Sequence, residues 1–315
     1  MMQSRTHRFN QDVTILVMDI DGITITRNSH RAMQRFKDEL SSYYDIKDMG
    51  NLHWILGIGI DSDCKNWTIS FSQATYVQKI IKCFRMEDAN PLSIPITLGH
   101  NLSKSQSPIS DLDIEEMRDV LYREAVSSLM YVVIGTRPDI AYTVSYLAIF
   151  MANLGHVHWE AMKQVIRYLK GTKNVKLILG KGGTVTWEEA DRQSRSGVKG
   201  YNDADGNSEE HCHAISGYAF CIDGGVISWN SRKQAIILLS TMESEYITMT
   251  HAAKEAIWMC MFLGKILLPL SKPMLLYCDN QSAIAVAKDD QFHAHTKHIN
   301  IHYYFICKAI TQNIL

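Results

Sequence analysis

The amino-acid sequence predicts an α+β protein, because strand-like and helix-like segments fall in separate runs along the chain. The C-terminal third contains three short segments rich in β-branched and aromatic residues, which we expect to form an antiparallel meander over 198–204, 215–222 and 225–231. A long helical stretch from about Met242 to Leu268 follows them. Strands that precede helices, without strict alternation, are typical of α+β folds.

Two polar stretches divide the chain. The first, Thr97–Asp113, is rich in Ser, Asp and Gly and lacks an apolar period, so we expect an exposed linker there. The second, Gly180–Lys199, contains a glycine pair and a polar cluster that interrupt the hydrophobic pattern. The segment between them reads as helical, and its last helix carries apolar side chains on one face at Met162, Val165, Ile166 and Leu169. The pattern therefore predicts a helical unit between the two polar stretches.

The last predicted helix of this unit also carries a basic face. Its basic residues include Lys163, Arg167, Lys170 and Lys173, and the only acid nearby is Glu160. A solvated surface is the simpler interpretation and by base rate the commoner one. The functional interpretation is a strip that contacts the phosphates of a nucleic acid and so fixes its position without reading its sequence.

Three acidic residues in the C-terminal third indicate a site for divalent cations. Asp203 ends a strand-like segment, Glu245 lies in what we expect to be the first turn of the long helix, and Asp279 ends a predicted strand over 274–279. Asp205 lies two residues beyond Asp203 and shares its strand face if the strand continues, so it is a secondary candidate. Mg²⁺ or Mn²⁺ prefers such oxygen ligands, and two-metal hydrolysis requires several carboxylates that converge.

Each of these acids also has an ordinary explanation. An acid at the start of a helix, such as Glu245, is favoured by the unsatisfied backbone N–H groups and the positive end of the helix dipole. Asp203 and Asp279 taken singly are unremarkable turn or surface acids. Their order along the chain, strand, hairpin, helix and second strand, is what favours a shared metal site.

Composition limits the possible function classes. The chain has 315 residues, 46% hydrophobic and 21% charged, with a net charge of −1, so any surface for nucleic acid must be local. Its seven cysteines are scattered without a CxxC pair, which favours free thiols in a reducing compartment. No signal peptide is visible, and the longest apolar stretch is interrupted by Lys265 and Pro269. We therefore expect an intracellular protein, cytoplasmic or nuclear and not secreted, without a membrane span.

Several motifs resemble a known family in their order and spacing. The segments GYNDAD, ISGYAFCIDGGVISWNSRKQ, LSTMESEY, AAKEAIWM, LYCDNQSAIAVAK and TKHI resemble the ribonuclease H domain of copia-type retrotransposon Pol polyproteins. The helical segment 126–173 resembles the part that joins reverse transcriptase to ribonuclease H in these polyproteins. DIKDMGNLHWILGIGI and ISFSQATYVQKII resemble the last part of the reverse transcriptase. The resemblance covers nearly the whole chain.

The resemblance implies three units and a substrate. We expect the end of a reverse-transcriptase palm and thumb over 13–100, a helical connection over 111–180, and a ribonuclease H-like domain over 197–315 that lacks the family's terminal strand and helix. It implies hydrolysis of RNA in RNA–DNA hybrids with Mg²⁺ or Mn²⁺ held by catalytic carboxylates, and no small-molecule cofactor. The matching ligands in this sequence are Asp203, Glu245 and Asp279, with Glu245 preferred over Glu243.

Departures from the family pattern limit these expectations. Where the polymerase has a Tyr-x-Asp-Asp turn, this sequence has Asp19-Ile20-Asp21-Gly22, so the second aspartate is a glycine. We expect a degenerate polymerase site at Asp21 and Gly22 and no polymerase activity, since one carboxylate cannot hold two ions. The nuclease site is expected to lack a fourth acid. Besides an active nuclease, the sequence allows a non-catalytic nucleic-acid-binding protein or a decayed remnant without function.

Overall fold

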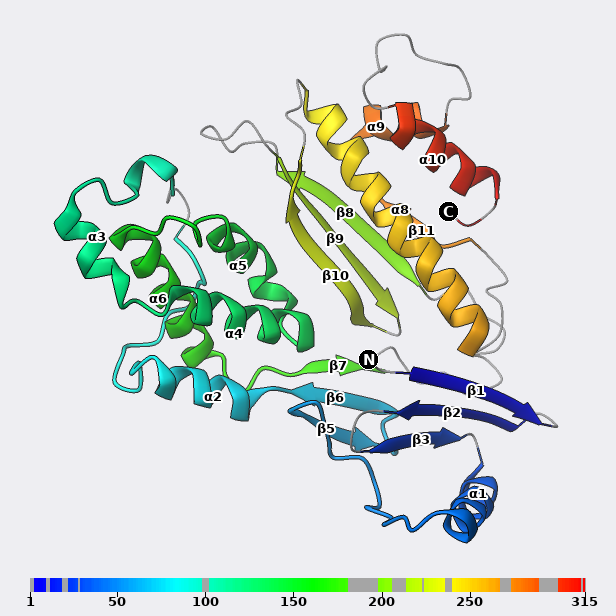
Figure 1. Ribbon diagram of the computed structural model, residues 1–315. Helices are drawn as coiled ribbons and strands as arrows, with labels where there is room; N and C mark the ends of the chain where they lie inside the picture. The colour runs from blue at the N-terminus through cyan, green and yellow to red at the C-terminus, as the bar shows by residue number, and fades with distance from the viewer. Residues whose placement is uncertain are drawn as a thin grey trace.

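In the computed structural model, the described residues form three sheets, a helical unit and a long helix that covers the third sheet (Figure 1). The residues that the structure describes are 3–9, 12–18, 22–27, 29–97, 102–180, 198–205, 214–222, 224–235, 240–266, 273–288, 300–312 and 314. Helices and sheets occur in separate runs, which confirms the predicted α+β class.

The described N-terminal residues form two small antiparallel sheets, the second of which is completed by a strand from beyond the helical unit. The first has the order β1-β2-β3 and precedes helix α1, which begins after Ser29; its elements are β1 (Gln3–Phe9), β2 (Asp12–Met18), β3 (Ile23–Arg27) and α1 (His30–Tyr43). The Ser29 hydroxyl accepts a hydrogen bond from Ala32 N at 3.4 Å, as expected of an N-cap. The second sheet has the order β4-β5-β6-β7, with β4 (Trp54–Ile55), β5 (Ile58–Asp63), β6 (Thr68–Ser72) and β7 (Leu177–Leu179).

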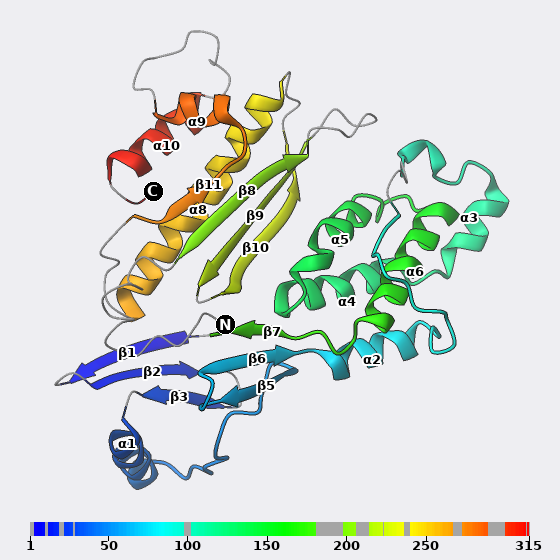
Figure 2. The ribbon, with the colours of Figure 1, turned by 180° about the vertical axis from the view of Figure 1, so that it is seen from behind.

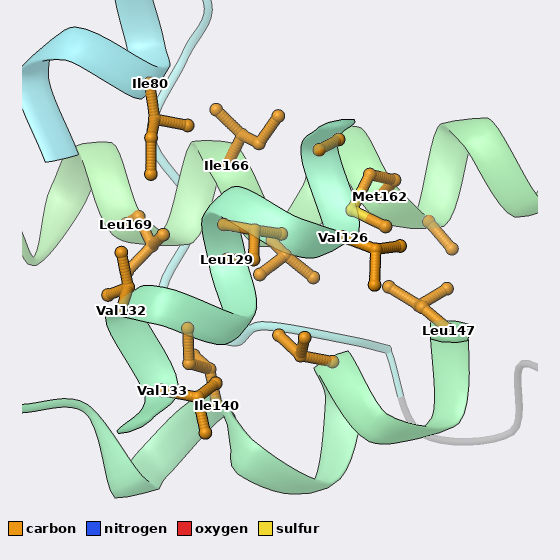
Figure 3. Close-up of a cluster of buried hydrophobic side chains, with 14 of the residues drawn as sticks. Ile80, Val126, Leu129, Val132, Val133, Ile140, Leu147, Met162, Ile166 and Leu169 are labelled. Carbon is orange, nitrogen blue, oxygen red and sulfur yellow. The ribbon is translucent and has the colours of Figure 1, made fainter. Parts of the chain in front are cut away.

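The helical unit encloses the largest hydrophobic core. Its helices are α2 (Ala74–Cys83), α3 (Asp111–Arg118), α4 (Tyr122–Gly135), α5 (Ala141–Ala148) and α6 (His156–Gly171). Figure 3 shows Ile80 of α2 beside Ile166 and Leu169 of α6, and Leu129 of α4 is also fully buried in this cluster. The core therefore includes α2, which the sequence-based division placed in the preceding unit; that division itself stays a prediction.

The expectation of an exposed linker over Thr97–Asp113 was wrong in part. Leu102 and Ser103 are buried, with 2% and 3% of their surface exposed. Tyr146 Oη donates a hydrogen bond to the Leu102 carbonyl at 2.9 Å, and His158 Nε2 lies 3.1 Å from the Ser103 carbonyl. These bonds satisfy backbone groups that burial would otherwise leave without partners, so a polar segment can lie inside.

The described residues of the C-terminal part form a four-stranded sheet of order β10-β9-β8-β11 and three helices. Its elements are β8 (Lys199–Asp205), β9 (Ile215–Ile222), β10 (Gly225–Lys233), α8 (Thr241–Ile266), β11 (Leu275–Tyr277), α9 (Gln281–Lys288) and α10 (Asn300–Thr311). The antiparallel meander β8-β9-β10 is confirmed, and β11 pairs with β8 in parallel. Gly224 has φ +78° at the tight turn before β10, where a side chain would be strained.

The two faces of this sheet are covered by different parts of the chain. Figures 1 and 2 show α8, in yellow to orange, along the sheet, with the green helical unit next to β10. Phe220 of β9 packs with Ala252 and Ala256 of α8 on one face. Trp229 of β10 points to the other face, where its Nε1 donates a hydrogen bond to the Val133 carbonyl of α4 at 3.0 Å. The sheet therefore lies between α8 and the helical unit.

Two further sequence expectations concern membranes and thiols. In the described part of the chain, no helix has both the length and the apolar character needed to cross a bilayer. The cysteines that the structure describes carry free thiols.

Candidate metal centre

Glu245 lies near the start of α8 and is the most buried of the candidate acids. Helix α8 begins at Thr241, so Glu245 occupies the second turn and not the first; the acid in the first turn is Glu243. The Glu243 N–H donates to the Ser240 hydroxyl at 3.3 Å, which caps the helix one residue earlier than a start at Met242 would require. The sequence predicted a helix start about one residue later than the observed one. Glu243, and not Glu245, is therefore the acid in the first turn, where the helix dipole favours a negative charge.

The Glu245 carboxylate points at the end of strand β8. Only 6% of the residue is exposed, and Oε1 accepts a hydrogen bond from Ala204 N at 3.1 Å. Among the described residues, the buried Oε2 has no hydrogen-bond partner. A buried carboxylate oxygen without a partner is costly, so this atom is suited to bind a cation.

Asp203 and Asp279 lie on neighbouring segments of the chain, because β8 pairs in parallel with β11. Tyr201 and Tyr277 are in register, and each aspartate lies two residues further along its own segment. Strand β11 ends at Tyr277, so Asp279 follows the strand and does not belong to it, contrary to the strand predicted over 274–279. Helix α9 follows closely after the strand. The Asn280 side chain caps this helix by accepting a hydrogen bond from Ala283 N at 2.9 Å.

Two of the three predicted carboxylates, those of Glu245 and Asp279, converge. One ligand atom each from Glu245, Cys278 and Asp279 lie within 4.8 Å of one another. Asp203 is not part of this group. It pairs with Gly217 of β9 and lies on the same sheet face as Trp229, which is the face opposite α8. Its negative charge nevertheless acts on Glu245.

Burial and neighbouring charge change the acidity of this cluster. Burial raises the pKa of Glu245 to about 7, the hydrogen bond from Ala204 opposes this increase, and the charges of Asp203 and Asp279 add to it. Burial first, and then the charges of Glu245 and Asp279, raise the pKa of the Cys278 thiol. The cluster thus gathers negative charge in a poorly solvated place, which a bound cation would relieve.

The donor set fits a hard divalent cation. Glu245, Asp279 and Asp203 offer carboxylate oxygens, which Mg²⁺ and Mn²⁺ prefer. Cys278 is the neighbour that the sequence reasoning missed; a thiol with a raised pKa stays protonated and is a poor ligand for such ions. Its place beside Asp279 in the sequence was the only available signal, and it does not distinguish a ligand from a packed core side chain.

Asp205, the secondary candidate, is the last residue of β8, so the strand does continue past Asp203. Both aspartates are exposed and lie on the same face of the strand. The Asp205 carboxylate accepts a hydrogen bond from the hydroxyl of Tyr142 in α5 at 3.3 Å. Burial and then the charge of Asp205 raise the pKa of Tyr142 to about 12.

The predicted basic strip is largely engaged in contacts within the protein. Arg167 Nε donates to the Asn90 carbonyl at 2.6 Å, and Lys170 Nζ donates to the Ala89 carbonyl at 2.8 Å. Lys163 forms an ion pair with Glu160 one helical turn away. Lys173 is exposed beyond the end of α6. Arg167 and Lys170 therefore hold the segment after α2 against α6, and a role in phosphate binding stays a prediction.

The degenerate polymerase site can be located only in part. Asp21 lies outside the described residues. Gly22 is exposed, and among the described residues no heavy atom beyond its chain neighbours lies within 4 Å of the position that a Cβ would occupy there. A side chain would therefore fit at this glycine.

Comparison with known proteins places the chain in a family. Residues 5–98 match the family model described as reverse transcriptase (RNA-dependent DNA polymerase). Over 98% of its length the chain is 36% identical to the retrovirus-related Pol polyprotein from transposon TNT 1-94 of Nicotiana tabacum. The chain belongs to the Pol polyproteins of copia-type retrotransposons. The retrovirus-related Pol polyprotein from transposon RE1 of Arabidopsis thaliana is 30% identical over 97% of this chain.

This copia-type Pol chain spans about a fifth of the length of these two relatives, 22% and 20% respectively. A third relative is the secreted RxLR effector protein 161 of Plasmopara viticola, 37% identical over 144 residues, which are 45% of this chain and 94% of that protein. No solved structure matches the chain.

Proposed function

We propose that the C-terminal sheet with its helices binds Mg²⁺ or Mn²⁺ through Asp203, Glu245 and Asp279 and hydrolyses the RNA strand of RNA–DNA hybrids. The observation that carries the proposal is the convergence of Glu245 and Asp279, in which the buried Glu245 Oε2 has no hydrogen-bond partner among the described residues and the charge of Asp203 acts on the same carboxylate. Membership of the copia-type Pol family supports nucleic acid as the partner.

The three acids would have different tasks. The hydrogen bond from the Ala204 N–H holds the Glu245 carboxylate in place. The second oxygen of Glu245 is therefore oriented before a cation binds. Asp203 and Asp279 are exposed, so they leave the site open to a phosphodiester from solvent. Divalent cations held by these carboxylates would lower the pKa of a bound water and stabilise the leaving oxygen.

The polymerase reaction is not part of the proposal. Only one candidate carboxylate, Asp21, was found at the matching turn, and Gly22 has no side chain to offer. We therefore propose that this chain does not catalyse template-directed DNA synthesis. Primer extension by the purified protein would contradict this proposal.

The decisive experiment is hydrolysis of a hybrid that carries a label on its RNA strand, with Mg²⁺ or Mn²⁺. Wild-type protein is expected to cleave the RNA strand only, and Asp203→Asn, purified in the same way, is expected to be inactive. Asp45→Asn is the matched control, since Asp45 is exposed in the segment after α1 and far from the site in sequence. Hybrid binding without cleavage by wild type would instead favour the non-catalytic nucleic-acid-binding alternative.

A further inference from the structure

Strand β8 directs a polar side chain, that of Asn202, to the sheet face that α8 covers. Along β8 the buried residues Gly200 and Asn202 alternate with exposed ones, so these two share a face. Gly200 lies against the ring of Phe220, which packs with α8. Asn202 therefore faces the helix that carries Glu245.

The Asn202 side chain is buried without a hydrogen-bond partner. Only 6% of the residue is exposed, and among the described residues neither Oδ1 nor Nδ2 has a partner. Burial of this kind is costly, because the amide has lost its contacts with water and gained none in exchange. In contrast, the buried Gln234 donates from Nε2 to Ser216 Oγ at 2.8 Å and to the Ser244 carbonyl at 3.0 Å. The Asn202 amide is therefore suited to bind a ligand.

The pairing of β8 with β11 sets Asn202 beside Cys278. Tyr201 and Tyr277 are in register in this parallel pair, and Asn202 and Cys278 are the residues that follow them. Cys278 packs against an apolar cluster that contains Tyr246 of α8, so it lies on the same sheet face as Asn202. The two side chains are therefore neighbours under α8.

Cys278 connects Asn202 to the converging carboxylates. Its Sγ lies within 4.8 Å of one oxygen each of Glu245 and Asp279. Burial raises the pKa of the Cys278 thiol, and a contact with the Asn202 amide lowers it in part. Sulfur is only a weak hydrogen-bond acceptor for the amide nitrogen, and it offers the amide oxygen little. The oxygen of Asn202 is thus the atom that a ligand would engage.

We propose that the side-chain oxygen of Asn202 is a ligand of the divalent cation held by Glu245 and Asp279, on the α8 side of the sheet. This inference rests on the proposed function, because the cation is the one assigned there. Carbonyl oxygens suit Mg²⁺ and Mn²⁺. An amide also adds no negative charge to a place where Glu245 is already difficult to ionise. One cation would satisfy Asn202 Oδ1 and Glu245 Oε2 together.

The first test separates metal binding from folding. Asn202→Leu keeps about the size of the side chain and removes its oxygen. Its affinity for Mn²⁺, from electron paramagnetic resonance of the free ion, is expected to fall roughly tenfold or more, since loss of even an outer-shell partner costs roughly 10–100-fold. In chelator its thermal midpoint is expected to equal or exceed that of wild type, because no hydrogen bond within the protein is lost. Unchanged affinity would overturn the inference.

Two control variants calibrate these measurements. Gln234→Met removes a buried amide that does have protein partners, so it is expected to lower the thermal midpoint in chelator. Asn230→Leu changes an exposed amide of β10, two strands away from β8, and is expected to keep the wild-type affinity for Mn²⁺. A lower midpoint in Asn202→Leu, similar to that of Gln234→Met, would indicate a structural amide, and the aspartate variant then decides.

Asn202→Asp keeps the shape of the side chain and makes its oxygen a stronger ligand. At about pH 8, where a buried carboxyl with a raised pKa is still ionised, it is expected to tighten Mn²⁺ binding roughly tenfold, because affinity follows the charge of the ligands. Equal or weaker binding would overturn the inference.

Nuclear magnetic resonance of protein labelled with ¹⁵N-asparagine gives a readout that needs no change in affinity. The side-chain amide signal that is missing from Asn202→Leu identifies Asn202. Saturating Mg²⁺ is expected to shift this signal in wild type, and a signal that does not move would refute ligation by Asn202.

The outcomes separate this inference from the proposed function. If Glu245→Gln abolishes Mn²⁺ binding while both Asn202 variants bind as wild type does, the metal centre stands and the role of Asn202 is refuted. If the Asn202 variants change affinity as expected but wild type leaves the RNA strand intact, the ligand assignment stands and the proposed hydrolysis fails. If wild type binds no Mn²⁺ at millimolar concentration, both proposals fail.

Discussion

Replacing Glu245 by glutamine is expected to stabilise the metal-free protein at alkaline pH and to have little effect in acid. Glutamine keeps the shape of the side chain and an oxygen that can accept the hydrogen bond from Ala204 N. It removes the buried negative charge that wild type must accommodate once Glu245 ionises. The effect therefore isolates the cost of that charge.

The magnitude follows from the acidity of Glu245. Its pKa is about 7 in the folded protein against an ordinary value of 4.5, a difference worth about 3 kcal/mol in the free energy of unfolding. Because the folded-state pKa is the higher one, the folded state binds the proton more tightly. The associated stability is fully present below pH 4.5 and is lost as the pH rises through about 7.

The assay is urea denaturation followed by tryptophan fluorescence, in chelator, at about pH 5 and about pH 8.5. Glu245→Gln is expected to exceed wild type in stability by up to about 3 kcal/mol at the higher pH, and the difference is expected to shrink at the lower pH. Glu243→Gln retains Glu245 and serves as the control, which should keep the wild-type pH dependence. An equal pH dependence in wild type and Glu245→Gln would refute the reasoning.

Three further substitutions test the packing and the basic strip. Leu129→Ala, in the fully buried core of the helical unit, is expected to lower the free energy of unfolding by about 2–5 kcal/mol in urea denaturation. Trp229→Phe removes the hydrogen bond to the Val133 carbonyl and is expected to cost about 1–2 kcal/mol in the same assay. Arg167→Gln loses the contact with the Asn90 carbonyl and is expected to lower thermal stability without changing the salt dependence of hybrid binding. A salt slope reduced by about one would assign Arg167 to phosphate contact instead.

Local sequence patterns predicted the parts of the fold that depend on local periodicity. The meander β8-β9-β10 and the long helix α8 were expected from short segments rich in β-branched and aromatic residues and from a long helical stretch, and the structure reproduces them with small shifts at the ends. Packing that joins distant segments was not predictable. The burial of Leu102 depends on Tyr146, 44 residues later, and nothing in the polar segment itself signals this partner.

The candidate site shows the same division. The acids Glu245 and Asp279 could be named from their places at a helix start and after an apolar run. The approach of Cys278 and the unpartnered oxygen of Glu245 required the three-dimensional arrangement. The contact between Tyr142 and Asp205 joins two separate units of the chain, so no local pattern encodes it.

The most direct test of the metal centre is a crystal of the protein soaked in Mn²⁺, with anomalous diffraction to locate the ion. The proposal predicts a peak at bonding distance, roughly 2 Å, from carboxylate oxygens of Glu245 and Asp279, with Asp203 turned towards it. The peak should disappear in Glu245→Gln crystals soaked in the same way. Crystals of wild type that show no ion at these carboxylates, or ions only elsewhere on the surface, would contradict the central claim.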